Sequence, residues 1–154
     1  MTVALDANIL LRLTDTTAAH HPVVVSALDT LRTQGRPLRT FPQAVYEFWV
    51  VATRPVPSNG LGLSPAECDQ TITNLLTAFP LLTDTAGLFT EWRTLVATYA
   101  CHGKVAHDAR YIAAMRTHGI TTLLTFNTAD FARYPGLDIL DPAAVTALPP
   151  STTP

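Results

Sequence analysis

Carboxylate side chains in apolar surroundings are the residues of this sequence most suited to chemistry. Only 14% of the 154 residues are charged, whereas 47% are hydrophobic, so an acid inside an apolar segment stands out. Asp6 directly follows the apolar run at positions 3–5. Glu47 is the only charge in the apolar segment 43–52, and Asp108 opens another segment with helical spacing. These three acids form the first candidate site.

Grouped carboxylates point to one kind of chemistry. Mg²⁺ and Mn²⁺ prefer oxygen ligands, and carboxylates supply most of them in proteins. Carboxylates brought together without a cation repel one another and raise each other's pKa. One or two ions held by such a group activate a water and stabilise the leaving oxygen of a phosphodiester. If the fold brings the acids together, they imply a bound cation of the kind that nuclease sites often hold.

Each acid also has a simpler interpretation. Asp6 suits the N-cap of a helix that starts near position 8. Asp108 suits the first turn of a helix, where the helix dipole favours negative charge. Glu47 would destabilise the fold by several kcal/mol if it were buried without a partner, and pairing with Arg54 is the ordinary solution. Only the joint placement of the three acids favours a site.

Short apolar segments alternate with helical ones along the chain, which sets the expected architecture. Strands are expected at 3–5, 37–40, 79–83, 121–125 and 137–140, and helices at 8–13, 23–33, 42–52, 65–77, 86–100 and 107–118, with a turn or short helix at 127–131. This alternation predicts an α/β fold with a short parallel central sheet covered by helices on both faces. Loops at the carboxyl ends of such strands form the site, so Asp6 and residues 127–130 are expected there.

Composition narrows the setting of the protein. The net charge of −2 and pI of about 6.2 count mildly against nucleic-acid binding, although a bound metal ion changes the charge that a phosphate meets. Two cysteines without a motif indicate a reducing compartment. We find no secretory signal and no membrane-spanning stretch, and expect a cytoplasmic protein. One domain is expected over 1–141, with a proline-rich tail at 142–154.

Four segments, taken in order, resemble the PIN-domain family and specifically the toxins of VapBC-type toxin–antitoxin pairs. They are VALDANIL at 3–10, the helix around YEF at 46–48, HDARYIAA at 107–114 and LTFNTADF at 124–131. The resemblance runs from residue 3 to about residue 140. It implies a PIN-like fold and a Mg²⁺- or Mn²⁺-dependent endoribonuclease that hydrolyses structured RNA, such as loops of transfer or ribosomal RNA.

The resemblance also implies roles for individual acids. Asp6, Glu47 and Asp108 match the family's metal-binding and catalytic acids. The family places one more acidic or polar residue in the last segment, where Asn127 and Asp130 compete. We favour Asp130, because it keeps the charge and precedes a phenylalanine as the pattern does.

Polar neighbours and partners complete the expectation. Asn8, Thr125 and Asn127 are expected beside the metal ligands, where they orient carboxylates or water through hydrogen bonds. The resemblance further implies a cognate antitoxin protein that blocks the site, and a homodimer or a toxin–antitoxin hetero-oligomer.

Two other functions fit parts of the pattern. A catalytically silent PIN-like module would bind RNA or a partner protein without cutting, and the three intact acids argue against it. An aspartyl phosphatase would use Asp6 as a nucleophile. That enzyme's motif needs a second aspartate two residues later, where this sequence has Asn8.

Overall fold

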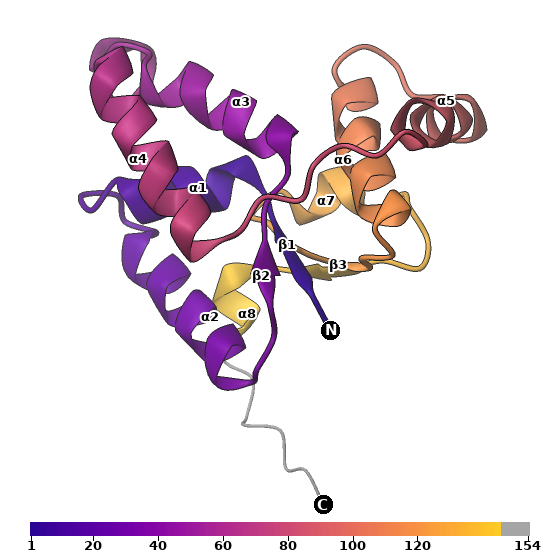
Figure 1. The fold of residues 1–154 in the computed structure, drawn as a ribbon, viewed down its shortest axis with the longest axis horizontal. Coiled ribbons are helices and arrows are strands. Elements are labelled where there is room, and N and C mark those ends of the chain that lie inside the picture. Colours follow the sequence, from indigo (N-terminus) through magenta and orange to yellow (C-terminus); the bar gives the residue numbers. More distant parts are fainter. Residues whose placement is uncertain (146–154) are drawn as a thin grey trace, which may run out of the picture.

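Four short strands form one parallel sheet at the centre of the protein (Figure 1). The structure is a computed structural model, and it describes residues 1–145. The sheet order is β2-β1-β3-β4, and the strands are β1 (Val3–Leu5), β2 (Leu38–Arg39), β3 (Thr122–Leu124) and β4 (Asp138–Leu140). β1 and β3 are buried along their whole length, as expected of parallel strands with both faces covered.

The order of the strands fixes where a site can form. β1 pairs with β2 on one side and with β3 on the other, so Val3 lies opposite both Leu38 and Thr122. After β1 the chain therefore continues to β2 on one side of β1, and it later returns to the opposite side of β1 as β3. In open parallel sheets this switch point leaves a crevice at the carboxyl ends of the two strands. Asp6 follows β1 there and Thr125 follows β3.

Helices flank the sheet on both sides. In Figure 1, α1 to α4 gather on one side of the strands and α5 and α6 on the other. α4 begins at Pro65 because Ser64 caps it, and the side chains of Ser64 and Glu67 form a reciprocal capping box. The bounds are α1 (Ala7–Thr14), α2 (His21–Thr33), α3 (Pro42–Ala52), the 3-10 turn η1 (Val56–Ser58), α4 (Pro65–Ala78), α5 (Leu88–Thr98), α6 (Val105–Thr117), α7 (Thr128–Phe131) and α8 (Pro142–Val145).

This architecture confirms the predicted α/β fold with a short parallel sheet, but one predicted strand is wrong. Residues 79–83 contribute only an isolated bridge between Thr40 and Leu81. Phe79 ends α4 with a buried side chain, and Pro80 has no N–H to donate to a neighbouring strand. A second difference is that α6 begins at Val105, so Asp108 lies in its first turn and does not open the helix.

The carboxyl-terminal part also differs from the expected tail. Residues 142–145 form α8, which packs against α2 with Pro142 and Val145 buried. The rest of the predicted tail, residues 146–154, lies outside the described residues. In the part of the chain that the structure describes, no helix has the length and apolar character that crossing a membrane requires.

Candidate active site

Asp6 is the acid that the fold holds most tightly. It lies between β1 and α1, is only 7% exposed, and caps α1 by accepting a hydrogen bond from the Ala7 N–H at 2.7 Å through Oδ1. Its other oxygen, Oδ2, accepts from Thr125 Oγ1 at 2.6 Å and from Asn8 Nδ2 at 3.0 Å. The capping role and the site role proposed for Asp6 are therefore compatible, because different oxygens serve them.

Asn8 and Thr125 connect the ends of β1 and β3 around this carboxylate. Asn8 Nδ2 also donates to Thr125 Oγ1 at 3.0 Å, and Asn8 Oδ1 accepts from the Phe126 N–H at 3.3 Å. Thr125 is fully buried, and its Oγ1 accepts from the Asn127 N–H at 3.0 Å. Asn8 and Thr125, two of the three predicted neighbours, therefore contact Asp6 directly. Asn127, the third, takes part only through its backbone N–H.

Glu47 lies on the exposed face of α3, which corrects the reason for noticing it. The sequence suggested a carboxylate in a buried apolar helix, yet Tyr46, Glu47 and Val50 are all exposed. Glu47 Oε1 accepts a hydrogen bond from Gln43 Nε2 at 2.9 Å. The alternative ion pair with Arg54 is not among the salt bridges of residues 1–145.

Asp108 and Asp130 occupy the other side of the crevice. Asp108 is partly buried in the first turn of α6, and Asp130 is exposed in α7. Asn127 precedes α7 and is exposed, with no side-chain bond that caps the helix. Both candidates for the fourth position are therefore open to solvent near the carboxyl end of β3.

Electrostatic coupling ties the acids together. Burial raises the pKa of Asp6 to about 6, and the negative charges of Glu47 and Asp108 add to the rise against the hydrogen bonds from Thr125 and Ala7. Burial also raises the pKa of Asp108, assisted by the charges of Asp130 and Glu47. Glu47 therefore acts on both Asp6 and Asp108, and Asp130 acts on Asp108, although the four acids come from four separate parts of the chain.

Three side chains that the sequence analysis did not single out support this arrangement. The hydroxyl of Tyr111, which is buried, donates to the carbonyl of Leu5 immediately before Asp6. Gln43 Nε2 donates to the His107 carbonyl at 2.8 Å as well as to Glu47, so it joins α3 to α6. Gln43 Oε1 accepts in turn from Arg110 Nη1 at 3.3 Å.

Spacing offered a weak signal for Gln43 and Tyr111. Gln43 precedes Glu47 by one helical turn, and Tyr111 follows Asp108 by three residues, so each shares a helix face with an acid. Burial raises the pKa of Tyr111 well above its ordinary range, and the charges of Asp6 and Glu47 raise it further. Tyr111 therefore stays protonated and serves as a hydrogen-bond donor.

The donor set suits a hard divalent cation. The acids offer carboxylate oxygens, which Mg²⁺ and Mn²⁺ prefer. Burial is the main cause of the raised pKa values of Asp6 and Asp108, and a cation would relieve the repulsion between acids that adds to them. Within residues 1–145, no three His, Cys, Asp or Glu side chains are grouped closely enough to hold one ion as they stand. Glu47 and Asp130 are exposed, so their rotamers can change at little cost.

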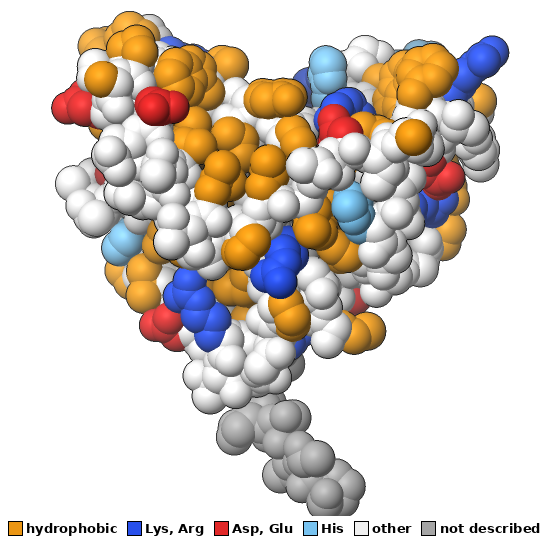
Figure 2. Space-filling model, viewed as in Figure 1, with side chains coloured by type: hydrophobic (Ala, Val, Ile, Leu, Met, Phe, Trp, Pro, Cys, Tyr) orange, Lys and Arg blue, Asp and Glu red, His pale blue; other side chains and the backbone are white. Residues whose placement is uncertain are grey.

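The surface is hollowed between the two groups of helices (Figure 2). Figure 2 shows a hollow between the side formed by α3 and α4 and the side formed by α5 and α6, with hydrophobic side chains on both.

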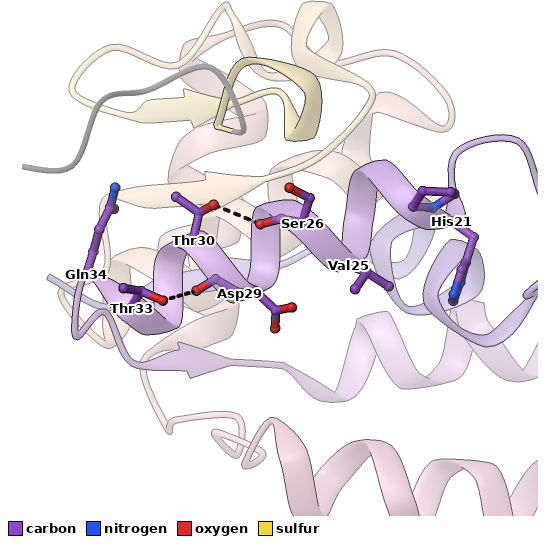
Figure 3. A pocket seen from close by; sticks show the side chains of 8 residues that line it. His21, Val25, Ser26, Asp29, Thr30, Thr33 and Gln34 are labelled. Carbon is purple, nitrogen blue, oxygen red and sulfur yellow. Dashed lines mark hydrogen bonds between the residues drawn. The ribbon is translucent and has the colours of Figure 1, made fainter.

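A cavity of about 690 Å³ lies elsewhere, along α2. Its hydroxyls turn back onto their own helix, since Thr30 donates to the Ser26 carbonyl and Thr33 to the Asp29 carbonyl (Figure 3). The volume of a cavity alone therefore does not identify the candidate active site.

A comparison with known protein families identifies the family of this chain. The model of the PIN domain matches residues 3–137, which is most of the chain. The chain belongs to the PIN domain family. The match includes all of Asp6, Glu47, Asp108 and Asp130. A search of curated proteins finds no match.

Solved structures share the PIN fold at low sequence identity. VapBC2 from Rickettsia felis, bound to a DNA fragment from its promoter, is 14% identical, with a TM-score of 0.69 over 91% of this chain and 98% of that one. VapBC-1 from nontypeable Haemophilus influenzae is 16% identical, with a TM-score of 0.65 over 92% and 98%. VapC20 from Mycobacterium tuberculosis, described as a sarcin-ricin loop cleaving toxin, is 20% identical, with a TM-score of 0.56 over 79% and 86%. At these identities the likeness concerns the fold.

Proposed function

We propose that this protein is a metal-dependent endoribonuclease and the toxin of a toxin–antitoxin pair. The observation that carries the proposal is that the charges of Glu47 and Asp108 both act on the buried Asp6, at the carboxyl end of β1. Membership of the PIN domain family and the fold shared with VapBC toxins support it. Asp6, Glu47, Asp108 and Asp130 are the proposed metal ligands, and Mg²⁺ or Mn²⁺ the proposed ions.

The residues of the chain divide the work of such a site. A bound divalent cation supplies Lewis acidity and an activated water for attack on the scissile phosphate. Asp6 keeps one carboxylate fixed, because Thr125 and Asn8 hold Oδ2 and Ala7 holds Oδ1. Such partners around a ligand orient it and tune its basicity. Asp108 adds a second carboxylate from α6, next to the crevice.

Glu47 and Asp130, the outer acids of the crevice, complete the proposed ligand set. Glu47 is held by a single hydrogen bond from Gln43, and Asp130 is exposed, so both can move onto an ion or an incoming RNA. We favour Asp130 over Asn127 as the fourth member because its charge already acts on Asp108. Asn127 is left to orient water or the phosphate.

Structured RNA is the proposed substrate. Loop nucleotides in transfer or ribosomal RNA are unpaired, so their backbone can bend into a notch that a duplex cannot enter. One structural neighbour, VapC20, is described as a toxin that cleaves the sarcin-ricin loop. The net charge of −2 makes a cation-filled acid site the more important source of attraction for phosphate.

An antitoxin is the proposed protein partner. A groove of about 400 Å³ on α3 is lined by Tyr46, Glu47, Val50, Val51 and Arg54. Tyr46 and Val50 are 63% and 57% exposed, and they lie one helical turn apart on α3, so they form an apolar strip beside Glu47. One structural neighbour, from Klebsiella pneumoniae, is described as a toxin–antitoxin complex. A partner segment on this groove would cover Glu47 and block the site, within a homodimer of the toxin or a hetero-oligomer.

Hydrolysis of RNA by the purified protein tests the proposal. We expect cleavage in Mg²⁺ or Mn²⁺, none in EDTA, and loss of cleavage in Asp6→Asn. Asp69→Asn is a matched control, because Asp69 is an exposed acid on α4, away from the four proposed ligands. Binding of RNA without metal-dependent cleavage would favour the silent module instead, and equal cleavage by Asp6→Asn would refute the residue assignment.

A further inference from the structure

A cavity beside the acids is lined by aromatic and cationic side chains that the proposed hydrolysis does not use. It measures about 430 Å³, within the roughly 300–1,000 Å³ typical of small-ligand sites. It lies between α5 and α6, and its lining residues are Leu88, Phe89, Trp92, Ala106, His107 and Arg110.

We infer that this cavity, the aromatic pocket, holds an unstacked nucleobase of the RNA substrate next to the cleaved phosphate. The inference rests on the proposed ribonuclease function and specifies how the same site would select RNA. It depends on three features of the pocket: its position, its aromatic surface and its weak net charge.

Position links the aromatic pocket to the acids through two hydrogen bonds. Arg110 in the pocket donates to Gln43 Oε1 at 3.3 Å, and Gln43 donates to Glu47 at 2.9 Å. His107, another lining residue, directly precedes Asp108 in α6, and its carbonyl accepts from Gln43 at 2.8 Å. A nucleotide whose phosphate reaches the acids therefore has its neighbouring base within reach of the pocket.

The aromatic surface is available for stacking. Phe89 is 64% exposed, and its ring centroid lies 5.8 Å from that of Trp92 at an interplanar angle of 37°. Trp92 is already fixed, because its indole N–H donates to the Ala106 carbonyl at 2.8 Å. Stacking on such rings is how proteins hold unpaired bases, and it needs no hydrogen bond from the ring.

Charge favours a base over a phosphate in this pocket. Arg110 is the permanent cation of the lining, and Asp84 neutralises it through a salt bridge of 2.6 Å. The remaining lining is apolar apart from His107. A phosphate would gain little there, whereas a base would meet ring faces together with N–H donors of Arg110 at the edge.

Binding of short RNA to catalytically idle wild-type protein tests the inference. We would titrate oligoadenylate and oligouridylate in EDTA, follow fluorescence anisotropy, and compare Phe89→Ala with Phe89→Tyr. Because loss of a stacking ring weakens binding by about 5- to 150-fold, we expect a loss in that range for Phe89→Ala and none for Phe89→Tyr. Val56→Ala, which trims an exposed apolar residue outside the pocket, is the matched control.

Two more measurements identify what occupies the pocket. RNA should quench tryptophan fluorescence in the wild type, and Trp92→Phe should lose most of the quenching while binding stays within about 3-fold. An abasic oligonucleotide should bind wild type and Phe89→Ala equally, because the base is the group that the ring recognises.

The outcomes separate this inference from the proposed function. Equal RNA affinity of wild type and Phe89→Ala overturns the aromatic pocket but leaves metal-dependent cleavage intact. Loss of self-association or of antitoxin binding in Phe89→Ala, with RNA affinity unchanged, makes the pocket a protein interface and also overturns it. Absence of cleavage in Mn²⁺, with the base-dependent affinity preserved, refutes the nuclease alone. Absence of any RNA binding overturns the aromatic pocket, and cleavage in Mn²⁺ decides the proposed nuclease separately.

Discussion

Asp6, the inner acid of the crevice, is held differently from Glu47 and Asp130, the outer acids. Asp6 is buried and its two oxygens accept three hydrogen bonds, from Ala7, Asn8 and Thr125. Glu47 is exposed and accepts one bond, from a neighbour on its own helix. The strand ends thus determine where one carboxylate lies, whereas helix surfaces carry the others.

This difference suggests a division between a fixed and an adaptable part of the site. A buried carboxylate with a raised pKa destabilises the folded protein above that pKa, so its retention calls for a reason other than stability. Exposed acids impose almost no such penalty and can adjust to the ion and the substrate. If this division is right, changes to the inner acid alter both stability and hydrolysis, and changes to the outer acids alter hydrolysis alone.

Asp6→Asn is the change with the largest expected effect. Removing a partner of a metal ligand already lowers metal affinity or activity by about 10- to 100-fold, so loss of the ligand itself should lower hydrolysis by more than about 100-fold. Initial rates of RNA cleavage in Mn²⁺ measure it. A variant within 3-fold or so of the wild type would show that Asp6 is only a helix cap.

The pH dependence of stability isolates the same carboxylate. Its pKa is raised from 3.8 to about 6, so the folded form binds the proton more tightly than the unfolded form does. Ionisation of Asp6 therefore lowers the free energy of unfolding as pH rises from about 4 to about 6. Above pH 6 or so, the total loss reaches up to about 3 kcal/mol. Urea unfolding in EDTA at several pH values should show this decline in the wild type relative to Asp6→Asn. Parallel pH profiles of the two proteins would contradict it.

Thr125→Val removes one support of Asp6 while keeping the shape of the side chain. Thr125 Oγ1 donates to Asp6 and accepts from Asn8 and Asn127, so these groups lose a buried partner. We expect a loss of about 1–3 kcal/mol in the free energy of unfolding and of about 10- to 100-fold in hydrolysis. Thr121→Val, at an exposed threonine before β3, is the control. Equal behaviour of the two variants would remove Thr125 from the site.

The outer acids should show the smallest change in stability. Glu47→Gln, Asp130→Asn and the control Asp69→Asn should each alter the free energy of unfolding by no more than about 0.5 kcal/mol, because exposed positions tolerate substitution. Only the first two should slow RNA cleavage. Asn127→Ala, assayed beside Asp130→Asn, shows which of the two is the fourth member: the larger loss in Asn127→Ala would reverse our assignment.

Local patterns in the sequence were sufficient to predict most elements of the fold. The apolar run before Asp6 and the helix expected at 65–77 each correspond to an element that the structure contains. The segment around Pro80 misled, because a short apolar run looks like a strand whether or not a neighbour can pair with it. Pairing is a tertiary property, and a single sequence does not contain it.

The candidate site shows the same limit. The strand ends and the resemblance pointed to Asn8 and Thr125, and the structure places both on Asp6, whereas the role of the four acids as metal ligands stays a prediction. The exposure of Glu47 was not predicted, since an amphipathic pattern does not reveal which apolar side chains remain uncovered. Gln43 and Tyr111 act across 64 and 106 residues of chain, on His107 and Leu5, and their spacing from Glu47 and Asp108 signals a shared helix face but not these long-range bonds.

Direct titration with Mn²⁺ tests most sharply whether the acids form a metal centre. Calorimetry at a pH above 7, where Asp6 is ionised, should show saturable binding to the wild type and to Asp69→Asn. Binding should weaken by at least about 10-fold in Asp6→Asn and in Asp108→Asn. Equal Mn²⁺ affinity in all four proteins, or none in the wild type, would contradict the account.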